Sequence, residues 1–438
     1  MRIDIVNGSI VTGDGNSFLE NTSVIVEGCI ISELPKVRYV PYNAYADKVI
    51  NARGGLIIPG VINIHAHGVA FGSFQPWALP GLSTERLLFN LNNHLLQGTT
   101  TIMNTDALSF PWEIEAINKI HPVNVKMATM HTPAHVKAAE LTLGHQVEER
   151  RKKFTAEEAV KLGAVALGEV GSPGTAYGTN EKSLRLGKVI SARHALALDK
   201  AVLAGDEAVI GKVLAEAGLE EVTIGEAKKL VEDTSVIPVA ACCDAIRDSV
   251  NYVKKLGLSV LAHAEPGMKE ALLEVAKEIG PKLIAVHVNH SFTPEEMVNF
   301  AKELKGLGAT IEIITADSFG ARQVEPSPEG TFALLKEGLV DVITTDFSGG
   351  YHDPILLVLQ KAIEKGIITL PRAIQLATSA PARIIPLVAP NRGIIEPGRV
   401  ADLCIVDRED IAKVRHVIIG GRTVVEDGRI VVGADKLI

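Results

Sequence analysis

Eight short apolar runs, separated by stretches with helical character, constrain the fold of this chain more than any other feature of the sequence. Each run has the length and composition of a strand that is buried on both faces, which is typical of parallel sheets. Strands that alternate with helices predict a parallel sheet, and eight repeats predict its closure into a (β/α)8 barrel. The runs lie at 61–67, 99–105, 125–130, 164–170, 258–264, 283–288, 310–315 and 341–346.

Helix start signals support this alternation. Thr293 is followed by Pro294 and, three residues after the threonine, by Glu296, which is the spacing of a capping box with proline at the first helical position. Thr155 and Glu158 repeat the capping-box spacing. These signals predict helices that begin between neighbouring apolar runs.

Five of the apolar runs end in residue types that bind metals. On its own, the pair His65 and His67 could be two ordinary histidines on an exposed strand, although side chains two residues apart on a strand point to the same face. The carboxyl ends of barrel strands, however, gather at one rim, where active sites are built. We therefore expect six side chains with a mixture of imidazole and carboxylate groups, suited to zinc, iron, manganese or cobalt, to converge there: His65, His67, Glu169, His263, His287 and Asp346.

The length of 438 residues exceeds the roughly 250 residues of a typical barrel, so additional structure is expected. Residues 1–57 and 388–438 have short strand-like runs separated by Gly-containing turns, and we predict that both ends form one small β-sandwich beside a barrel at 58–387. The long gap after Glu169 predicts a helical insertion at 172–238. An insertion at this end of a barrel strand serves as a lid, a substrate wall or a subunit contact, and the sequence leaves these alternatives open.

The composition excludes several classes of function. A net charge of −8 argues against a nucleic-acid partner, which normally requires a basic face. The chain has no apolar stretch of about 18 residues and no signal peptide pattern after Met1, so we expect no membrane contact and a cytoplasmic location. The four cysteines form neither a disulfide framework nor a Cys-x-x-Cys metal site, and we expect them to be packing residues.

Motifs spread over nearly the whole chain resemble those of the amidohydrolase superfamily. They are Pro59-Gly60 before His65-Ala66-His67, Gly98-Thr99-Thr100-Thr101 at the start of the second run, the strand-end residues His263 and His287, Asp346 after Thr344-Thr345, and Glu396-Pro397-Gly398-Arg399-Val400-Ala401-Asp402-Leu403 near the end. The resemblance implies a distorted (β/α)8 barrel with a terminal β-sandwich, one or two divalent metals and hydrolysis by activated water. It also implies a small-molecule substrate and a homo-oligomer.

The fourth strand narrows the resemblance to a subgroup. Many members with two metals carry a carboxylated lysine there, whereas this chain has Gly168-Glu169-Val170-Gly171. It is similar in this respect to enamidase, a hydrolase of a cyclic lactam in nicotinate breakdown, and more distantly to N-acetylglucosamine-6-phosphate deacetylase. The intact pair His65 and His67 favours the enamidase-like subgroup.

Carried over to this chain, the resemblance implies that His65, His67 and Asp346 hold one metal while His263 and His287 hold the other. Glu169 then bridges the two, and Asp346 is the general base that takes a proton from the attacking water and returns it to the leaving nitrogen. The general order of metal affinities favours zinc, with iron or manganese as alternatives.

The sequence therefore predicts a metal-dependent amidohydrolase that cleaves the C–N bond of a small cyclic amide, lactam or imide. Two other enzymatic functions stay open: deamination of an amino-heterocycle, suggested by Glu265 two residues after His263, and deacetylation of an N-acetyl amino sugar. A non-catalytic binding or scaffold protein is the third alternative, although every ligand position is filled.

Further polar residues near the strand ends are either substrate contacts or ordinary rim residues. His290 is an alternative ligand to His287, but it lies beyond the apolar run. The other candidates follow the second and third runs: Asn104, Asp106, His131 and His135.

Overall fold

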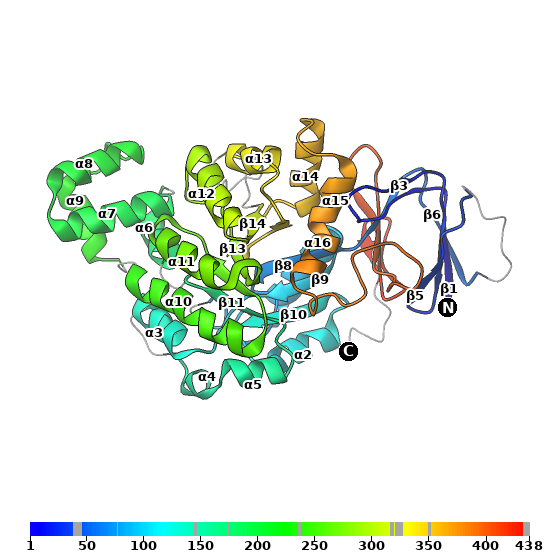
Figure 1. Ribbon diagram of the computed structural model, residues 1–438, viewed down its shortest axis with the longest axis horizontal. Helices are drawn as coiled ribbons and strands as arrows, with labels where there is room; N and C mark the ends of the chain where they lie inside the picture. Colours follow the sequence, from blue (N-terminus) through cyan, green and yellow to red (C-terminus); the bar gives the residue numbers. More distant parts are fainter. Residues whose placement is uncertain are drawn as a thin grey trace.

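The computed structural model describes residues 1–37, 46–76, 78–143, 147–172, 175–188, 190–234, 238–315, 319, 327–348 and 352–431. At its centre is a parallel sheet in the order β15-β14-β13-β12-β11-β10-β9-β8-β16, which closes because β16 directly follows β15 and pairs with β8 (Figure 1). The predicted (β/α)8 barrel is thereby confirmed. Its strands are β8 (Val61–His67), β9 (Thr99–Asn104), β10 (Asn124–Thr129), β11 (Ala166–Val170), β12 (Val260–His263), β13 (Leu283–Val286), β14 (Thr310–Ile314), β15 (Val342–Thr344) and β16 (Phe347–Ser348).

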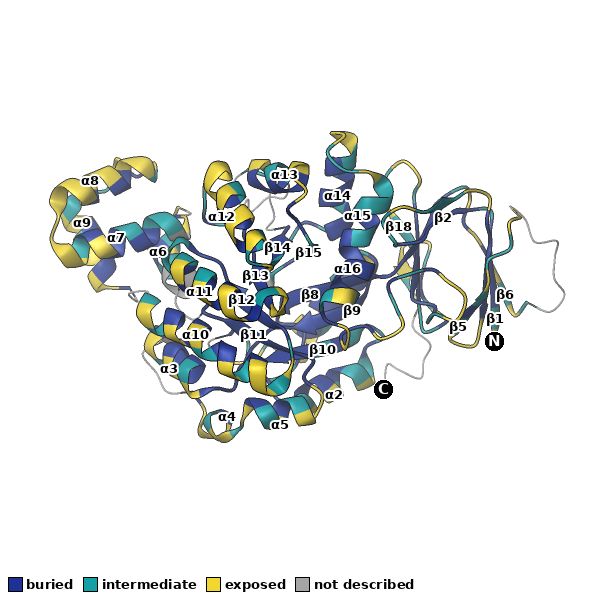
Figure 2. Ribbon diagram, in the orientation of Figure 1, coloured by how far each residue is buried: buried dark blue, intermediate teal, exposed yellow. Residues whose placement is uncertain are grey.

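Amphipathic helices surround this sheet, with exposed residues on their outer faces and buried residues towards the strands (Figure 2). In α1 (Thr84–Leu96) the buried leucines are Leu87, Leu91 and Leu95, one per helical turn. The predicted capping boxes at Thr155 and Thr293 are present. The other barrel helices are α2 (Pro111–Ile120), α3 (Pro133–Leu143), α4 (Glu149–Lys153), α5 (Ala156–Lys161), α10 (Val239–Leu256), α11 (Lys269–Ile279), α12 (Pro294–Gly306), α13 (Glu329–Lys336), α14 (Ile355–Glu364), α15 (Leu370–Ala377) and α16 (Ser379–Ile384), with short 3-10 helices at Pro266–Met268 and Gly280–Lys282.

In the described part of the segment between β11 and α10 there are four helices: α6 (Thr175–Leu186), α7 (Ala192–Ala204), α8 (Glu207–Glu216) and α9 (Ile224–Glu232). They share an apolar cluster of their own, and α7, α8 and α9 project beyond the barrel (Figure 1). An ion pair between Lys182 and Asp199, 3.0 Å long and almost completely buried, connects α6 to α7. These helices fall within the predicted insertion at 172–238, whose boundaries stay a prediction.

Both ends of the chain form a β-sandwich, as predicted from the sequence. One sheet has the order β5-β4-β1-β6 and the other the order β20-β19-β18-β17-β7-β2-β3. The second sheet joins the two ends because β17 pairs antiparallel with β7. The strands are β1 (Arg2–Val6), β2 (Ser9–Val11), β3 (Phe18–Leu19), β4 (Val24–Glu27), β5 (Ile30–Glu33), β6 (Lys48–Asn51), β7 (Leu56–Pro59), β17 (Leu403–Val406), β18 (Val414–Ile419), β19 (Arg422–Glu426) and β20 (Arg429–Ile430).

Gly60 explains why the sandwich and the barrel can meet within one residue. It separates β7 from β8, and a Cβ atom at this position would lie 2.2 Å from the Oγ1 atom of Thr100 on β9. Only glycine allows this close approach of the backbone to the neighbouring strand. Within the described part of the chain, no helix has both the length and the apolar character needed to cross a bilayer.

Candidate metal centre

The six predicted ligands come together at the carboxyl ends of the barrel strands as two groups. His65, His67 and Asp346 form the first group, and Glu169, His263 and His287 form the second. Within each group one potential ligand atom from every residue lies within 4.8 Å of the others. The fold thus assembles side chains that are up to 281 residues apart in the sequence, as the separation of His65 and Asp346 shows.

Glu169 belongs to the second group, and it directs one oxygen to the histidines of each group. Its Oε2 atom is 3.6 Å from Nε2 of His65 and 3.4 Å from Nε2 of His67. Its Oε1 atom is 2.7 Å from Nδ1 of His263 and 3.1 Å from Nε2 of His287. This is the arrangement that a carboxylate bridging two cations requires.

Asp346 completes the first group and has the most exposed side chain of the six candidate ligands. Its Oδ1 atom lies 3.4 Å from Nε2 of His65 and 3.5 Å from Nε2 of His67, and its side chain is 24% exposed whereas that of Glu169 is 4% exposed. The backbone at Asp346 is in the left-handed region, with φ at 44°, and its N–H donates to the carbonyl of His65 at 3.0 Å. Aspartate tolerates this conformation better than most residues.

A second layer of carboxylates holds the outward-facing ring nitrogens. Nδ1 of His65 is 2.9 Å from Glu312, Nδ1 of His67 is 2.9 Å from Asp106, and Nε2 of His263 is 3.5 Å from Glu265. Such contacts orient metal-binding imidazoles and increase their basicity. Glu312 is not among the predicted site residues, although a charged residue inside the apolar run 310–315 is a usable signal.

Asp106, predicted to be a substrate contact or an ordinary rim residue, lies against His67. Its carboxylate also accepts hydrogen bonds from the backbone N–H groups of Gly68 and Gln75, at 3.0 Å and 2.7 Å. It therefore connects one candidate ligand to the loop that follows β8.

The carboxylates give this centre a strong preference for positive charge. Burial disfavours a charged imidazole, but the neighbouring carboxylates outweigh it: they raise the pKa of His65 well above its ordinary value, and those of His67 and His263 to about 9. Burial likewise disfavours an ionised Glu169, yet His263, His287 and His65 lower the pKa of this carboxyl group well below its ordinary value. A cation bound among these groups would supply the positive charge that the carboxylates favour.

The residues present fit a divalent metal. Among the described residues, Nε2 of His65 is a buried nitrogen that has no hydrogen-bond partner, although it lies between Glu169 and Asp346. A buried polar atom without a partner is costly, and a coordinated cation would remove that cost. The set of imidazole nitrogens and carboxylate oxygens suits zinc, iron or manganese.

His290 and the other rim candidates lie outside the two groups. Nδ1 of His290 is 3.6 Å from Glu265, which agrees with the choice of His287 over His290. His131 stacks on Phe110, with ring centroids 5.7 Å apart. Burial lowers the pKa of His131 to about 3, and it lowers that of His135, whose Nε2 lies 2.8 Å from the Pro76 carbonyl, to about 4. Asn104 donates to Ser109 at 3.1 Å.

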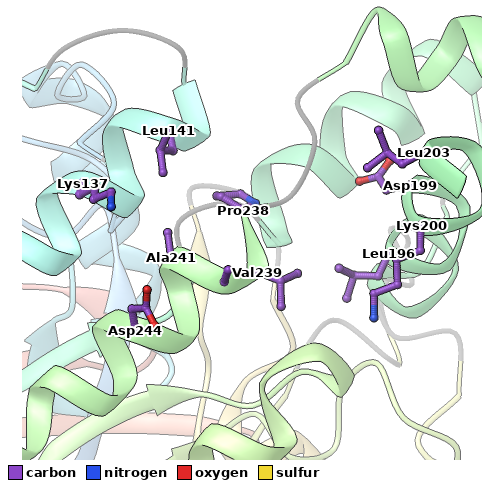
Figure 3. Close-up of a pocket in the computed structure, with 11 residues that line it drawn as sticks. Lys137, Leu141, Leu196, Asp199, Lys200, Leu203, Pro238, Val239, Ala241 and Asp244 are labelled. Atoms are coloured by element: carbon purple, nitrogen blue, oxygen red, sulfur yellow. The ribbon is translucent and has the colours of Figure 1, made fainter.

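A cavity of about 450 Å³ lies apart from the candidate metal centre, between α3, α7 and α10. Figure 3 shows Leu196 and Leu203 on one side of it and Leu141 on the other. None of the six candidate ligands lines this cavity.

Comparison with curated proteins finds distant relatives that match nearly the full chain. A dihydroorotase of Pelotomaculum thermopropionicum is 23% identical over 436 residues, covering 93% of this chain and 89% of the relative. A dihydroorotase of Endomicrobium trichonymphae is also 23% identical, over 425 residues, with coverages of 93% and 90%.

Solved structures share the fold at lower sequence identity. A prolidase complexed with N-methylphosphonate-L-proline superposes with a TM-score of 0.60 and 15% identity, covering 98% of this chain and 100% of the other. Triazine hydrolase from Arthobacter aurescens has a TM-score of 0.56 and 14% identity, with coverages of 100% and 97%.

A family model matches most of the chain. The model of the amidohydrolase family matches residues 56–424, which extend from the last strand before the barrel to the second-last strand of the sandwich. Members of this family are typically dependent on divalent metals, in agreement with the two groups of imidazole and carboxylate side chains. The chain belongs to the amidohydrolase family and is a hydrolase of C–N bonds.

Proposed function

We propose that this protein hydrolyses the C–N bond of a small cyclic amide, lactam or imide at the rim where the two groups meet. The observation that carries the proposal is the position of Glu169, with one carboxylate oxygen directed to each group. The similarity of the chain to two dihydroorotases supports a cyclic amide as the class of substrate. The glutamate on the fourth barrel strand, together with the intact His65 and His67 pair, supports an enamidase-like subgroup.

In this proposal, His65, His67 and Asp346 hold one divalent cation, His263 and His287 hold a second, and Glu169 is shared. When bound, one or two such cations supply a Lewis acid that acidifies a water and polarises the substrate carbonyl. Zinc is favoured over iron or manganese by the usual order of affinities. A homo-oligomer acting on a small molecule stays part of the proposal.

Asp346 is the proposed general base because it is the candidate ligand that is open to the rim. Its side chain is 24% exposed, whereas Glu169 accepts from His263 and His287 on its other side. The oxygen of water bonds to the carbonyl carbon, the C–N bond breaks, and Asp346 carries the proton of the water to the leaving nitrogen. With a cyclic amide, the new carboxylate and the new amine remain in a single product molecule.

Glu265 gives a specific reason to retain deamination of an amino-heterocycle as the second candidate. Its Oε1 atom accepts a hydrogen bond from Ser291 at 3.0 Å, while its Oε2 atom is buried and, among the described residues, has no hydrogen-bond partner. Burial opposes ionisation, but His263 and His290 lower the pKa of this carboxyl group to about 2. An oxygen in this position could contact the nitrogen of a heterocyclic substrate.

A product assay separates these functions. The purified, metal-loaded protein is offered lactams, hydantoins, amino-heterocycles and N-acetyl amino sugars, and mass spectrometry is combined with assays for ammonia and acetate. We expect a product heavier than the substrate by one water, with neither ammonia nor acetate released. Ammonia release would favour deamination and acetate release would favour deacetylation. Stoichiometric binding without turnover would instead indicate a non-catalytic protein.

A further inference from the structure

We propose that Glu312 is a positioning residue that couples the two groups of candidate ligands. This inference rests on the metal centre of the proposed function, but it concerns a residue that supplies no ligand itself. Glu312 lies in the middle of β14, a strand from which none of the six candidate ligands comes, and its side chain is 0% exposed. A carboxylate buried this deeply is unfavourable unless donors compensate for the lost water.

Three donors compensate for it, and each belongs to a different part of the centre. Glu312 accepts hydrogen bonds from Nδ1 of His65 on β8, at 2.9 Å, from the backbone N–H of His287 after β13, and from the hydroxyl of Thr344 on β15. His65 belongs to the first group and His287 to the second. Thr344 lies two residues before Asp346, which also belongs to the first group.

The bond to His287 fixes a backbone conformation that this residue would otherwise disfavour. His287 has φ at 43°, in the left-handed region, where a non-glycine residue persists only if its surroundings hold it. Because the same carboxylate orients the ring of His65, a change at Glu312 reaches both groups at once. The sheet order places β13 and β15 on either side of β14, so these contacts extend across neighbouring strands.

Asp106 provides a comparison because it contacts only one group. Among the described residues, the Asp106 carboxylate accepts hydrogen bonds from β8 and the loop after it: from Nδ1 of His67 and from the N–H groups of Gly68 and Gln75. Neutralising Asp106 should therefore weaken one metal site, whereas neutralising Glu312 should weaken both.

The experiment is a cobalt titration of the metal-free, full-length protein, followed by visible absorption so that each equivalent of Co²⁺ has its own affinity and spectrum. Loss of such an outer carboxylate typically costs about 10- to 100-fold in metal affinity. We expect Glu312→Gln to weaken both equivalents by about this factor and to change both spectra. Asp106→Asn should weaken one equivalent and leave the other close to the wild-type value.

Asp402→Asn is the matched control. Asp402 is a buried carboxylate at the junction with the sandwich and accepts from Arg392 at 2.8 Å and from the N–H of Gly420 at 2.7 Å, but it contacts none of the six candidate ligands. This variant should lower the thermal stability without changing either cobalt affinity. The control therefore distinguishes the general effect of neutralising a buried carboxylate from a specific effect of Glu312 on both metal sites.

The inference is overturned if folded Glu312→Gln weakens only one equivalent or neither. If that variant does not fold, Thr344→Val and Thr344→Ser replace it: the valine should weaken cobalt binding and the serine, which keeps the hydroxyl, should restore it. Equal binding by both would overturn the inference. Wild-type protein that binds no Co²⁺ would overturn the proposed function as well. If Glu312→Gln weakens both equivalents as expected but the wild-type protein hydrolyses none of the substrates, only the proposed function is contradicted.

Discussion

The metal-free protein should lose stability as the pH rises from about 6.5 to about 9. Burial alone would lower the pKa of His67, but its hydrogen bonds to Asp106 and Glu169 raise it from 6.5 to about 9. A histidine with a raised pKa stabilises the fold fully below the pKa of the unfolded chain, and this contribution is lost as the pH rises through the pKa of the folded protein. The difference corresponds to about 3 kcal/mol for His67 alone.

Urea unfolding of chelator-treated protein, measured at intervals from about pH 6 to about pH 9, tests this expectation. The free energy of unfolding should fall across that window in the metal-free protein. With divalent metal bound, the fall should disappear because a cation replaces the protons. Asp106→Asn removes a hydrogen bond that raises the pKa of His67, so the free energy of unfolding of this metal-free variant should fall less over the same pH range. A free energy that is constant or rises with pH in metal-free wild-type protein would refute the reasoning.

Three other variants test separate parts of the structure. Asp346→Asn should reduce turnover by about 100- to 10,000-fold, the usual contribution of a general base, while keeping the fold and most of the bound metal; full activity in a steady-state assay would contradict its role. Glu169→Ala should lower the affinity of both metal sites, measured by metal content after dialysis, and loss from only one site would argue against a shared carboxylate. Asp199→Ala should destabilise the protein by about 3–5 kcal/mol in urea unfolding because it leaves the buried ammonium of Lys182 without this carboxylate, whereas a change below about 1 kcal/mol would show that the pair contributes little.

The barrel could be predicted from the sequence because each strand is a short apolar run with a recognisable end. The first run, 61–67, coincides with β8, and the predicted run 283–288 begins with β13, which ends at Val286. The strand-end position of each ligand followed directly from these runs. The division of the sandwich into its two sheets could not be predicted, since pairing such as that of β17 with β7 joins segments more than 340 residues apart.

The second layer of the centre was harder to predict for a related reason. Glu312 occupies an interior strand position, where nothing local shows that its partners come from β8, from the residue after β13 and from β15. Asp106 could be placed at the rim, but the direction of its side chain depends on the loop that contains Gln75. Local patterns thus identified the candidate ligands, whereas the contacts that orient them are set by the packing of distant strands.

The central claim is that the two groups of side chains hold divalent cations on either side of Glu169. Anomalous diffraction at a metal absorption edge, from crystals of protein purified with its native metal, tests it most directly. We predict one or two anomalous peaks, each beside an oxygen of Glu169. Each peak should lie either near His65 and His67 or near His263 and His287. Metal-replete crystals with no peak among these residues, or with metal bound only elsewhere, would contradict the account.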